Sequence, residues 1–258
     1  MTAAITALAS AAPKRRVSVA ALNTATGASY SMGAKSGIWT ASVYKLFILE
    51  TLLLERQRTG TTLSDGEAGT AARAIENSDN VSGYDLFLDI GGNAGLTKGA
   101  RALGLSHTVP GQSDPTFTTT SAEDCLTLLK NLVAGGPLDK RSRSFTLGLM
   151  RDVEADQRWG IGSVADRGTG FANKNGWLSI NNTNGPGEDD GGLWVANSLG
   201  IVTVGGQQVL MAVLTEHNPD FATGVRLVQA ITRQAVKAVV TPATLATRPS
   251  GHQHAPKH

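Results

Sequence analysis

The hydrophobic pattern near the N-terminus has a period of two. Apolar and polar positions alternate over residues 17–21, and a turn at residues 24–27 separates them from a second extended run over residues 28–32. Alternation of this kind is typical of strands, so the two runs predict a β-hairpin. The Ala-rich residues 3–12 predict a short helix before the hairpin, and the proline that follows them directly ends this helix.

The middle of the chain has the period of helices. Helical patterns cover residues 39–54, 68–76, 83–89 and 96–103. The spacing of Thr120 and Glu123 matches a capping box, which predicts the start of a further helix that continues through Leu132. We expect no strand between about residue 60 and residue 150. The middle of the chain therefore predicts an all-helical block.

Strand patterns return in the last part of the chain, at residues 170–177, at 193–197 continuing into 201–204, and at 209–215. A helix with one apolar face is predicted over residues 220–239. Strands at both ends of the sequence predict one sheet. The fold class is α/β (α+β), with an antiparallel sheet flanked by terminal helices and an inserted all-helical domain. The expected units are a sheet domain (1–36 and 151–245), a helical domain (37–150) and a flexible tail (246–258).

Composition narrows the classes of function. A chain of 258 residues with 41% hydrophobic content can bury a sizeable core. Its formal net charge of +2 comes without a basic stripe, so nucleic acid is not an expected partner. The single cysteine, Cys125, excludes an internal disulfide and a cysteine-based metal cluster. We expect no metal site and no cofactor.

Targeting signals in the sequence are weak. No segment has the unbroken apolar length that a membrane span requires. The first residues lack a positive region and a strong apolar core, so they are a poor signal peptide. The location stays open, and one interpretation is a secreted or extracytoplasmic protein whose signal peptide is absent from this chain. We expect a monomer.

The helix expected over residues 39–54 carries the first candidate for chemistry. Ser42 and Lys45 are three residues apart, so on a helix their side chains lie on the same face. A serine hydroxyl becomes a nucleophile when a neighbouring base takes its proton, and a desolvated lysine can be that base. The alternative is that Ser42 caps the helix and Lys45 points into water. The apolar residues that follow favour a buried helix.

Two further polar clusters occur along the chain. In the first, Ser78-Asp79-Asn80, the serine could relay a proton and the amide of Asn80 could bind a substrate carbonyl, although these residues also form ordinary caps and turns. In the second, Lys174-Asn175-Gly176, the glycine would let a substrate approach the strand closely beside the lysine. The alternative is a lysine that faces water.

Taken together, Ser-x-x-Lys, Ser-Asp-Asn and Lys-x-Gly in this order resemble the signature of the penicillin-recognising serine hydrolases, most of all the class A β-lactamases. The resemblance covers nearly the whole chain, and it places the site in a cleft between the two parts. It implies that Ser42 is acylated, that Lys45 exchanges its proton and that Ser78 passes a proton to the leaving group. It also implies that Asn80 binds the substrate and positions Lys45.

The resemblance further implies a strand that pairs with the substrate. Lys174 and Gly176 would belong to this strand, with Lys174 attracting a substrate carboxylate. The backbone N–H groups of Ser42 and Trp177 would form the oxyanion hole. An arginine often assists carboxylate binding in such clefts, and Arg158 is the candidate, although a solvated or structural arginine is the alternative.

The chain departs from the family pattern in two places. Asn175 replaces the threonine of Lys-Thr-Gly, so a hydroxyl that would contact the substrate carboxylate is lost, although an amide can still donate. The loop between residues 105 and 118 has no glutamate of the kind that activates the deacylating water in class A enzymes. Asp114 is the only carboxylate in this loop and His107 the only other candidate base. Asp114 could instead be a turn residue.

The sequence therefore predicts a serine acyl hydrolase that forms an acyl-Ser42 intermediate with a small-molecule or peptide substrate. β-Lactam turnover is expected to be weak or absent without the loop glutamate. The alternatives are a D,D-peptidase that acts on peptidoglycan stem peptides and an esterase or amidase. A different class is a non-catalytic penicillin-type binding or sensor module.

Overall fold

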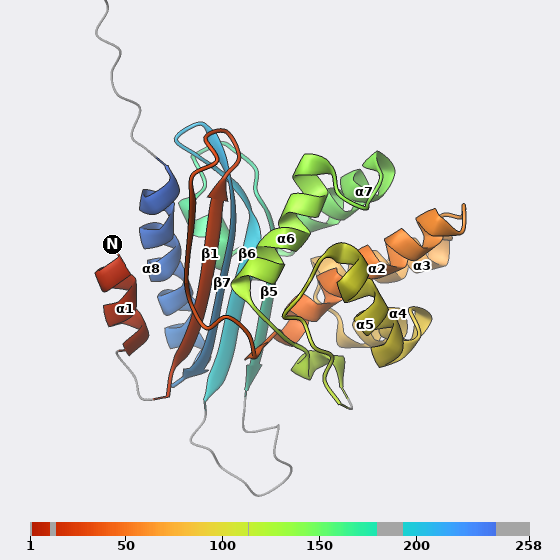
Figure 1. Cartoon of the computed structure of the whole chain (residues 1–258), viewed down its shortest axis with the longest axis horizontal. Coiled ribbons are helices and arrows are strands. Elements are labelled where there is room, and N and C mark those ends of the chain that lie inside the picture. The colour runs from red at the N-terminus through yellow and green to blue at the C-terminus, as the bar shows by residue number, and fades with distance from the viewer. Residues whose placement is uncertain (1, 11–13, 113, 180–192, 241–258) are drawn as a thin grey trace, which may run out of the picture.

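A five-stranded antiparallel sheet forms the centre of the computed structural model, which describes residues 2–10, 14–112, 114–179 and 193–240 (Figure 1). The strand order is β2-β1-β7-β6-β5, so the N-terminal hairpin and the late strands share one sheet, as predicted. The strands are β1 (Arg16–Asn23), β2 (Ser29–Gly33), β5 (Ala172–Ser179), β6 (Trp194–Val204) and β7 (Gln207–Asn218). The expected tail at residues 246–258 lies outside the described residues.

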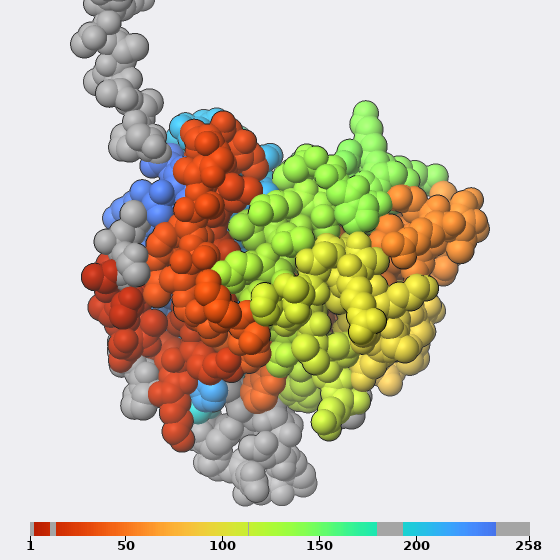
Figure 2. All heavy atoms as spheres, in the orientation of Figure 1, coloured from red at the N-terminus to blue at the C-terminus, as the bar shows by residue number. Residues whose placement is uncertain are grey.

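Helices cover both faces of this sheet (Figure 1). The long C-terminal helix lies along one face with the N-terminal helix beside it, and the helical block lies against the other face, where residues 122–130 contact β1 and β7. Figure 2 shows green atoms of this block beside the red and orange atoms of the hairpin. The expected α+β architecture is confirmed. The helices are α1 (Thr2–Ser10), α2 (Tyr44–Arg58), α3 (Asp65–Glu76), α4 (Asn80–Asp89), α5 (Gly92–Leu103), α6 (Ala122–Lys130), α7 (Lys140–Arg151) and α8 (Phe221–Val239).

The helical block contains one piece of sheet, so the expectation of no strand between residues 60 and 150 is wrong. β4 (Thr119–Thr120) pairs antiparallel with β3 (Ile38–Trp39), which directly precedes Ser42. A two-residue strand has no period to detect, and its partner is far away in sequence. The predicted capping box is also wrong by one position, because Ser121 is the residue that caps α6 and accepts from the backbone N–H of Asp124.

Helix α2 is the centre of the helical block. Every residue from Tyr44 to Leu54 is buried, because α3, α4, α5 and α7 surround the helix. A helix that is apolar on all sides needs such an environment. Two residues with ionisable side chains, Lys45 and Glu50, nevertheless lie in this stretch with no exposed surface. Their burial is the main electrostatic feature of the fold.

Glu50 lies in the core with its carboxyl group fully buried. Neither of its carboxyl oxygens has a hydrogen-bond partner in the described part of the chain. Burial raises the pKa of Glu50 well above its usual value, because a carboxylate loses its hydration there. The folded state therefore keeps a proton that the unfolded chain releases above its ordinary pKa near 4.5.

We predict that Glu50→Gln stabilises the protein increasingly as the pH rises above about 4.5. Above that pH the unfolded chain gains free energy by releasing this proton, whereas the folded wild type must keep the proton or bury a charge. The free energy of unfolding of the wild type therefore falls by up to about 1.4 kcal/mol per pH unit relative to the variant. Urea unfolding of both proteins between pH 5 and pH 8 measures the difference. Asp85→Asn on the exposed face of α4 is the control, and a difference that does not change with pH would contradict the prediction.

Candidate active site

Ser42 lies in a short 3₁₀ turn, η1 (Ala41–Val43), that runs directly into α2. Ala41 has a φ of +44°, in the left-handed region that residues with a side chain rarely adopt. Such a conformation persists only where the surrounding structure fixes it. Ser42 therefore lies in a strained turn that contacts with the rest of the protein must hold in place.

Asn197 on β6 is the first anchor of this turn. Its amide nitrogen donates to the backbone carbonyls of Trp39 (2.7 Å) and Thr40 (3.1 Å), and its amide oxygen accepts from the backbone N–H of Thr215 (2.9 Å). Asn197 is fully buried and lies opposite Gly176 in the sheet. One side chain thus joins the turn before Ser42 to two central strands.

Glu216 on β7 is the second anchor. Its carboxylate accepts from the backbone N–H of Trp39 and from the guanidinium of Arg16 at 3.0 Å. Burial raises the pKa of Glu216, although these two donors oppose the shift. Neither Asn197 nor Glu216 is predicted as a site residue from the sequence. Each is a single polar residue within a long strand, and its partners are not visible in the sequence.

Lys45 connects three candidate residues. Its amine lies 3.1 Å from Ser42 Oγ and 2.8 Å from Asn80 Oδ1, and it also donates to the backbone carbonyl of Ser78. The side chain has no exposed surface, so the alternative of a solvated Lys45 is excluded. Burial lowers the pKa of Lys45 to about 8, against the opposing negative charge of Asp79. A substantial fraction of this amine is therefore neutral near physiological pH.

The Ser78-Asp79-Asn80 cluster occupies the corner between α3 and α4. Asp79 is a helix cap, as the structural alternative supposes, because its carboxylate accepts from the backbone N–H of Ser82 at 2.7 Å. Ser78 has a φ of +58°, a second left-handed residue in the site. This corner turns both the Ser78 carbonyl and the Asn80 side chain toward Lys45.

Gly83 lies one turn after Asn80 and packs directly on the lysine. A Cβ at this position would lie 2.5 Å from Lys45 Cε and 2.8 Å from the Tyr44 hydroxyl oxygen. Real Cβ atoms do not approach so closely, so any side chain here would displace the amine. The sequence does not predict that Gly83 packs on Lys45. Only the presence of a glycine inside a helical pattern indicates a close approach here.

Lys174 and Gly176 approach the same place from the sheet. The amine of Lys174 donates to Ser78 Oγ at 2.8 Å and to the Asn175 carbonyl at 2.9 Å, and it has no exposed surface. Burial, and secondarily the charge of Lys45, lowers the pKa of Lys174 well below its usual value. A Cβ on Gly176 would lie 3.0 Å from the backbone nitrogen of Ser42. The end of β5 that carries Trp177 therefore lies against the Ser42 turn.

Asn175 and Arg158 lie in other surroundings. The amide of Asn175 donates to the backbone carbonyls of Gln157 (2.8 Å) and Trp159 (3.2 Å), and the side chain is buried. Arg158 is exposed, and its guanidinium lies 5.0 Å from the centre of the Phe171 ring. Asn175 therefore holds the segment from Gln157 to Trp159 against β5, and Arg158 packs on the Phe171 ring.

Asp114 lies at the start of η2 (Pro115–Phe117), a 3₁₀ turn that contacts η1. Its carboxylate accepts from the backbone N–H of Thr116 at 2.7 Å, which is the expected turn role. The same carboxylate lies close enough to Tyr44 to contribute, after burial, to the raised pKa of that phenol. Asp114 therefore caps its turn and also lies near Tyr44, the residue before Lys45.

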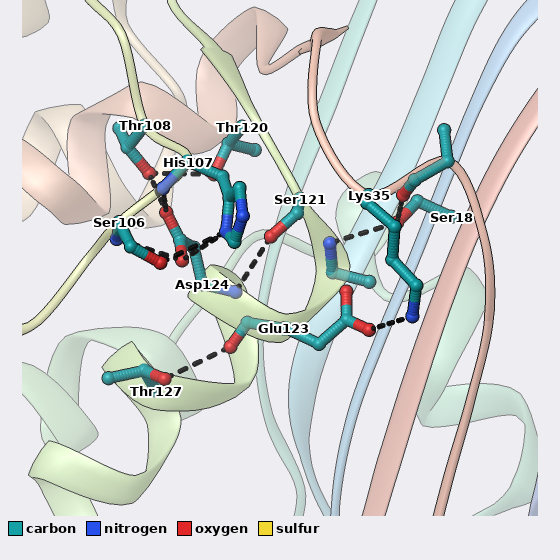
Figure 3. A network of polar contacts seen from close by, with 12 residues as sticks. Ser18, Lys35, Ser106, His107, Thr108, Thr120, Ser121, Glu123, Asp124 and Thr127 are labelled. Carbon is teal, nitrogen blue, oxygen red and sulfur yellow. Dashed lines mark hydrogen bonds and ion pairs between the residues drawn. The ribbon is translucent and has the colours of Figure 1, made fainter.

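His107 belongs to a separate network at the start of α6 (Figure 3). The carboxylate of Asp124 accepts from the backbone N–H groups of Ser106 and His107 and from the Thr108 hydroxyl. Ser106 Oγ and Asp124 Oδ1 both lie on the Nδ1 side of His107, at 3.0 and 3.6 Å. A catalytic triad needs its serine and its carboxylate on opposite ring nitrogens, so Ser106, His107 and Asp124 do not form one.

The described residues show neither a cluster of three metal-binding side chains nor a helix long and apolar enough to cross a membrane. Two surface hollows lie away from Ser42. One is bordered by α2, α3 and α7, and the other by α7 with β5 and β6. The expected cleft is neither of these, although helical-block residues and β5 do meet at Ser42.

Comparison with known proteins finds curated relatives that match about half of the chain. The putative lipoprotein LppW of Mycobacterium tuberculosis, and that of Mycobacterium bovis, are 36% identical to this chain over 128 residues. The match covers 48% of this chain and 41% of the relative, so less than half of the relative's length is matched.

Solved structures match over a larger part of the chain. The structure of PBP-A has a TM-score of 0.75 and 22% identity, covering 91% of this chain and 93% of that one. A β-lactamase from Chitinophaga pinensis has a TM-score of 0.76 and 20% identity, covering 90% and 96%. At such identities the likeness shows the fold. The model of the beta-lactamase enzyme family matches residues 54–239, more than half of the sequence, and the chain belongs to this family.

Proposed function

We propose that this protein is a serine acyl hydrolase of the class A β-lactamase type that forms an acyl-Ser42 intermediate with an amide, ester or β-lactam. One observation carries the proposal: the buried amine of Lys45 lies between Ser42 Oγ, Asn80 Oδ1 and the Ser78 carbonyl. A lysine in this position can be neutral and still fully hydrogen-bonded. The neutral form of this amine is the one that a general base requires.

The three partners can satisfy a neutral Lys45 as well as a charged one. The Asn80 amide oxygen and the Ser78 carbonyl can only accept hydrogen bonds, so they engage the two hydrogens of a neutral amine. The remaining lone pair then faces Ser42 Oγ, the only one of the three partners that can donate. This arrangement directs the hydroxyl proton of Ser42 toward Lys45.

The acylation step follows from these contacts. Ser42 Oγ forms a bond to the substrate carbonyl carbon while its proton passes to Lys45. The backbone N–H groups of Ser42 and Trp177 stabilise the developing oxyanion, because Gly176 brings the end of β5 against the Ser42 turn. The bond to the leaving group then breaks, and the leaving atom takes a proton from the Ser78 hydroxyl, which Lys174 contacts at 2.8 Å. The proton that Lys45 received from Ser42 passes to Ser78 in turn, so that Ser78 and Lys45 both return to their starting states.

A non-catalytic binding module is the alternative class, and the two lysines argue against it. Burying an amine that must be neutral or carefully paired costs several kcal/mol, and recognition alone does not require two of them beside a serine. A D,D-peptidase that acts on stem peptides remains a second candidate, because its acylation step uses the same residues.

We propose that the protein acts as a monomer outside the cytoplasm, in line with the lipoprotein name of its relatives.

We predict that penicillin G forms a covalent adduct with the protein, which intact-protein mass spectrometry would detect as the mass of the whole penicillin. The choice of probe is supported by PBP-A, a variant of which is known as an acyl-enzyme complex with penicillin G. Ser42→Ala should form no adduct. If the wild type gains no mass and also hydrolyses no ester, Ser42 is not a nucleophile and the proposed function is wrong.

The rate of acylation should rise with pH and level off above about 8, because burial lowers the pKa of Lys45 to about 8 and only the neutral amine accepts a proton. Below that pKa the rate should change about tenfold per pH unit. Stopped-flow measurement of ester acylation from pH 6 to pH 9, corrected with Ser42→Ala, tests this. A profile that is flat over this range would remove Lys45 from the role of base.

Deacylation should be slow, because Asp114 is the only carboxylate between residues 105 and 118 and its side chain is held by the Thr116 N–H. We predict that Asp114→Asn lengthens the lifetime of the penicillin adduct and that Asp114→Glu, one methylene longer, shortens it by about tenfold or more. His107→Gln is the control and should have no effect. Rapid release from the wild type that persists in Asp114→Asn would show that another group activates the water.

A further inference from the structure

The hydroxyl of Tyr44 is a polar group that the fold does not use. Tyr44 lies between Ser42 and Lys45 in the chain, and its side chain is only 2% exposed. The amine of Lys45 lies 5.6 Å from the centre of the Tyr44 ring. A buried tyrosine hydroxyl usually has a hydrogen-bond partner, but this one has none in the described part of the chain. It can therefore bind a water molecule.

The Tyr44 hydroxyl lies on the side of α2 that faces α4, as the Lys45 side chain does. A Cβ on Gly83 would lie 2.8 Å from Tyr44 Oη and 2.5 Å from Lys45 Cε, so both atoms border the same point on α4. Lys45 Nζ in turn lies 3.1 Å from Ser42 Oγ. The unused hydroxyl is therefore a neighbour of the residues that carry out the proposed acylation.

The turn η2, which Asp114 begins, is held against η1, the turn of the proposed nucleophile. The backbone N–H of Thr40, directly before η1, donates to the carbonyl of Thr118, directly after η2, at 2.8 Å. The rings of Trp39 and Phe117 lie 5.9 Å apart, edge to face. Asp114 is therefore fixed at the edge of the site by backbone and ring contacts.

The Asp114 carboxylate is the one best placed to share a water molecule with Tyr44. One of its oxygens accepts from the backbone N–H of Thr116, and the other accepts no hydrogen bond from the described residues. Asp79 also lies near Tyr44, but both the backbone and the hydroxyl of Ser82 bind its carboxylate. Burial, followed by the charges of Asp114 and Asp79, raises the pKa of the Tyr44 phenol, which therefore stays protonated and can donate.

We propose that the Tyr44 hydroxyl and the Asp114 carboxylate together hold the water molecule that releases the acyl group from Ser42. The inference rests on the proposed acyl-Ser42 chemistry. The phenol donates to the water oxygen and the water donates to Asp114, which leaves one lone pair for the acyl carbon. The water oxygen bonds to that carbon, its proton passes to Asp114, and the bond to Ser42 Oγ breaks. The proton then moves from Asp114 to Ser42 Oγ as the carboxylic acid leaves.

Tyr44→Phe tests this role, because it removes the hydroxyl and keeps the ring beside Lys45. We expect the penicillin G adduct to last about tenfold longer or more, whereas its rate of formation should still rise with pH as in the wild type. Intact-protein mass spectrometry after removal of free penicillin measures the decay. Tyr84→Phe removes an exposed hydroxyl on α4 and should keep the wild-type lifetime.

An unchanged lifetime in Tyr44→Phe, or a wild-type adduct that is not released at all, would overturn the inference. Loss of acylation in Tyr44→Phe would also overturn it, since the hydroxyl would then act in the earlier step. A wild type that forms no adduct and hydrolyses no ester would instead overturn the proposed function.

The double variant Tyr44→Phe/Asp114→Asn tests whether the two groups hold one water molecule. If they do, the second substitution has little left to disturb, so the double variant should release the adduct within about twofold of the rate of the slower single variant. If the two effects multiply, the groups act separately and the shared water molecule is wrong.

Discussion

The burial of two lysine amines between the helical block and the sheet is the constraint on which the site depends. An amine without exposed surface must find hydrogen-bond partners inside the protein or lose several kcal/mol. Lys45 finds them on its own helix and at the corner before α4, and Lys174 finds them at that same corner and on β5. Ser78 serves both amines, its carbonyl binding Lys45 and its hydroxyl binding Lys174. Ser78 thus contacts a lysine from each part of the fold.

Two of the four described non-glycine residues with a positive φ lie beside these amines. They are Ala41, which directly precedes the proposed nucleophile Ser42, and Ser78, whose carbonyl and hydroxyl contact the two amines. Each costs of order 1–3 kcal/mol, so the surrounding contacts must hold it in place. Asn197 and Glu216 do this for the Ser42 turn from the two central strands. The long strands therefore act as a rigid support for a turn that could not hold its shape alone.

Sequence could predict the parts of the site that are local. Ser42 and Lys45 are neighbours on one helical segment, the apolar face of α8 has a clear period, and the hairpin has a short turn. The five-stranded sheet follows from such patterns. Asn197, Glu216 and the β3–β4 pair could not be predicted in the same way, because each joins residues far apart in the chain and a single polar residue does not reveal its partner. Gly83 was equally hidden, since a close approach depends on the neighbouring helix.

The change from threonine to asparagine at position 175 links the fold to its chemistry. A threonine hydroxyl offers one hydrogen, whereas the Asn175 amide offers two, and here both hold the segment from Gln157 to Trp159. Asn175 thus holds the segment that carries an aromatic ring beside Trp177. Lys45, Ser78 and Lys174 keep their mutual contacts on the other face of β5. One strand therefore supports two separate sets of contacts, because successive residues of a strand face opposite sides.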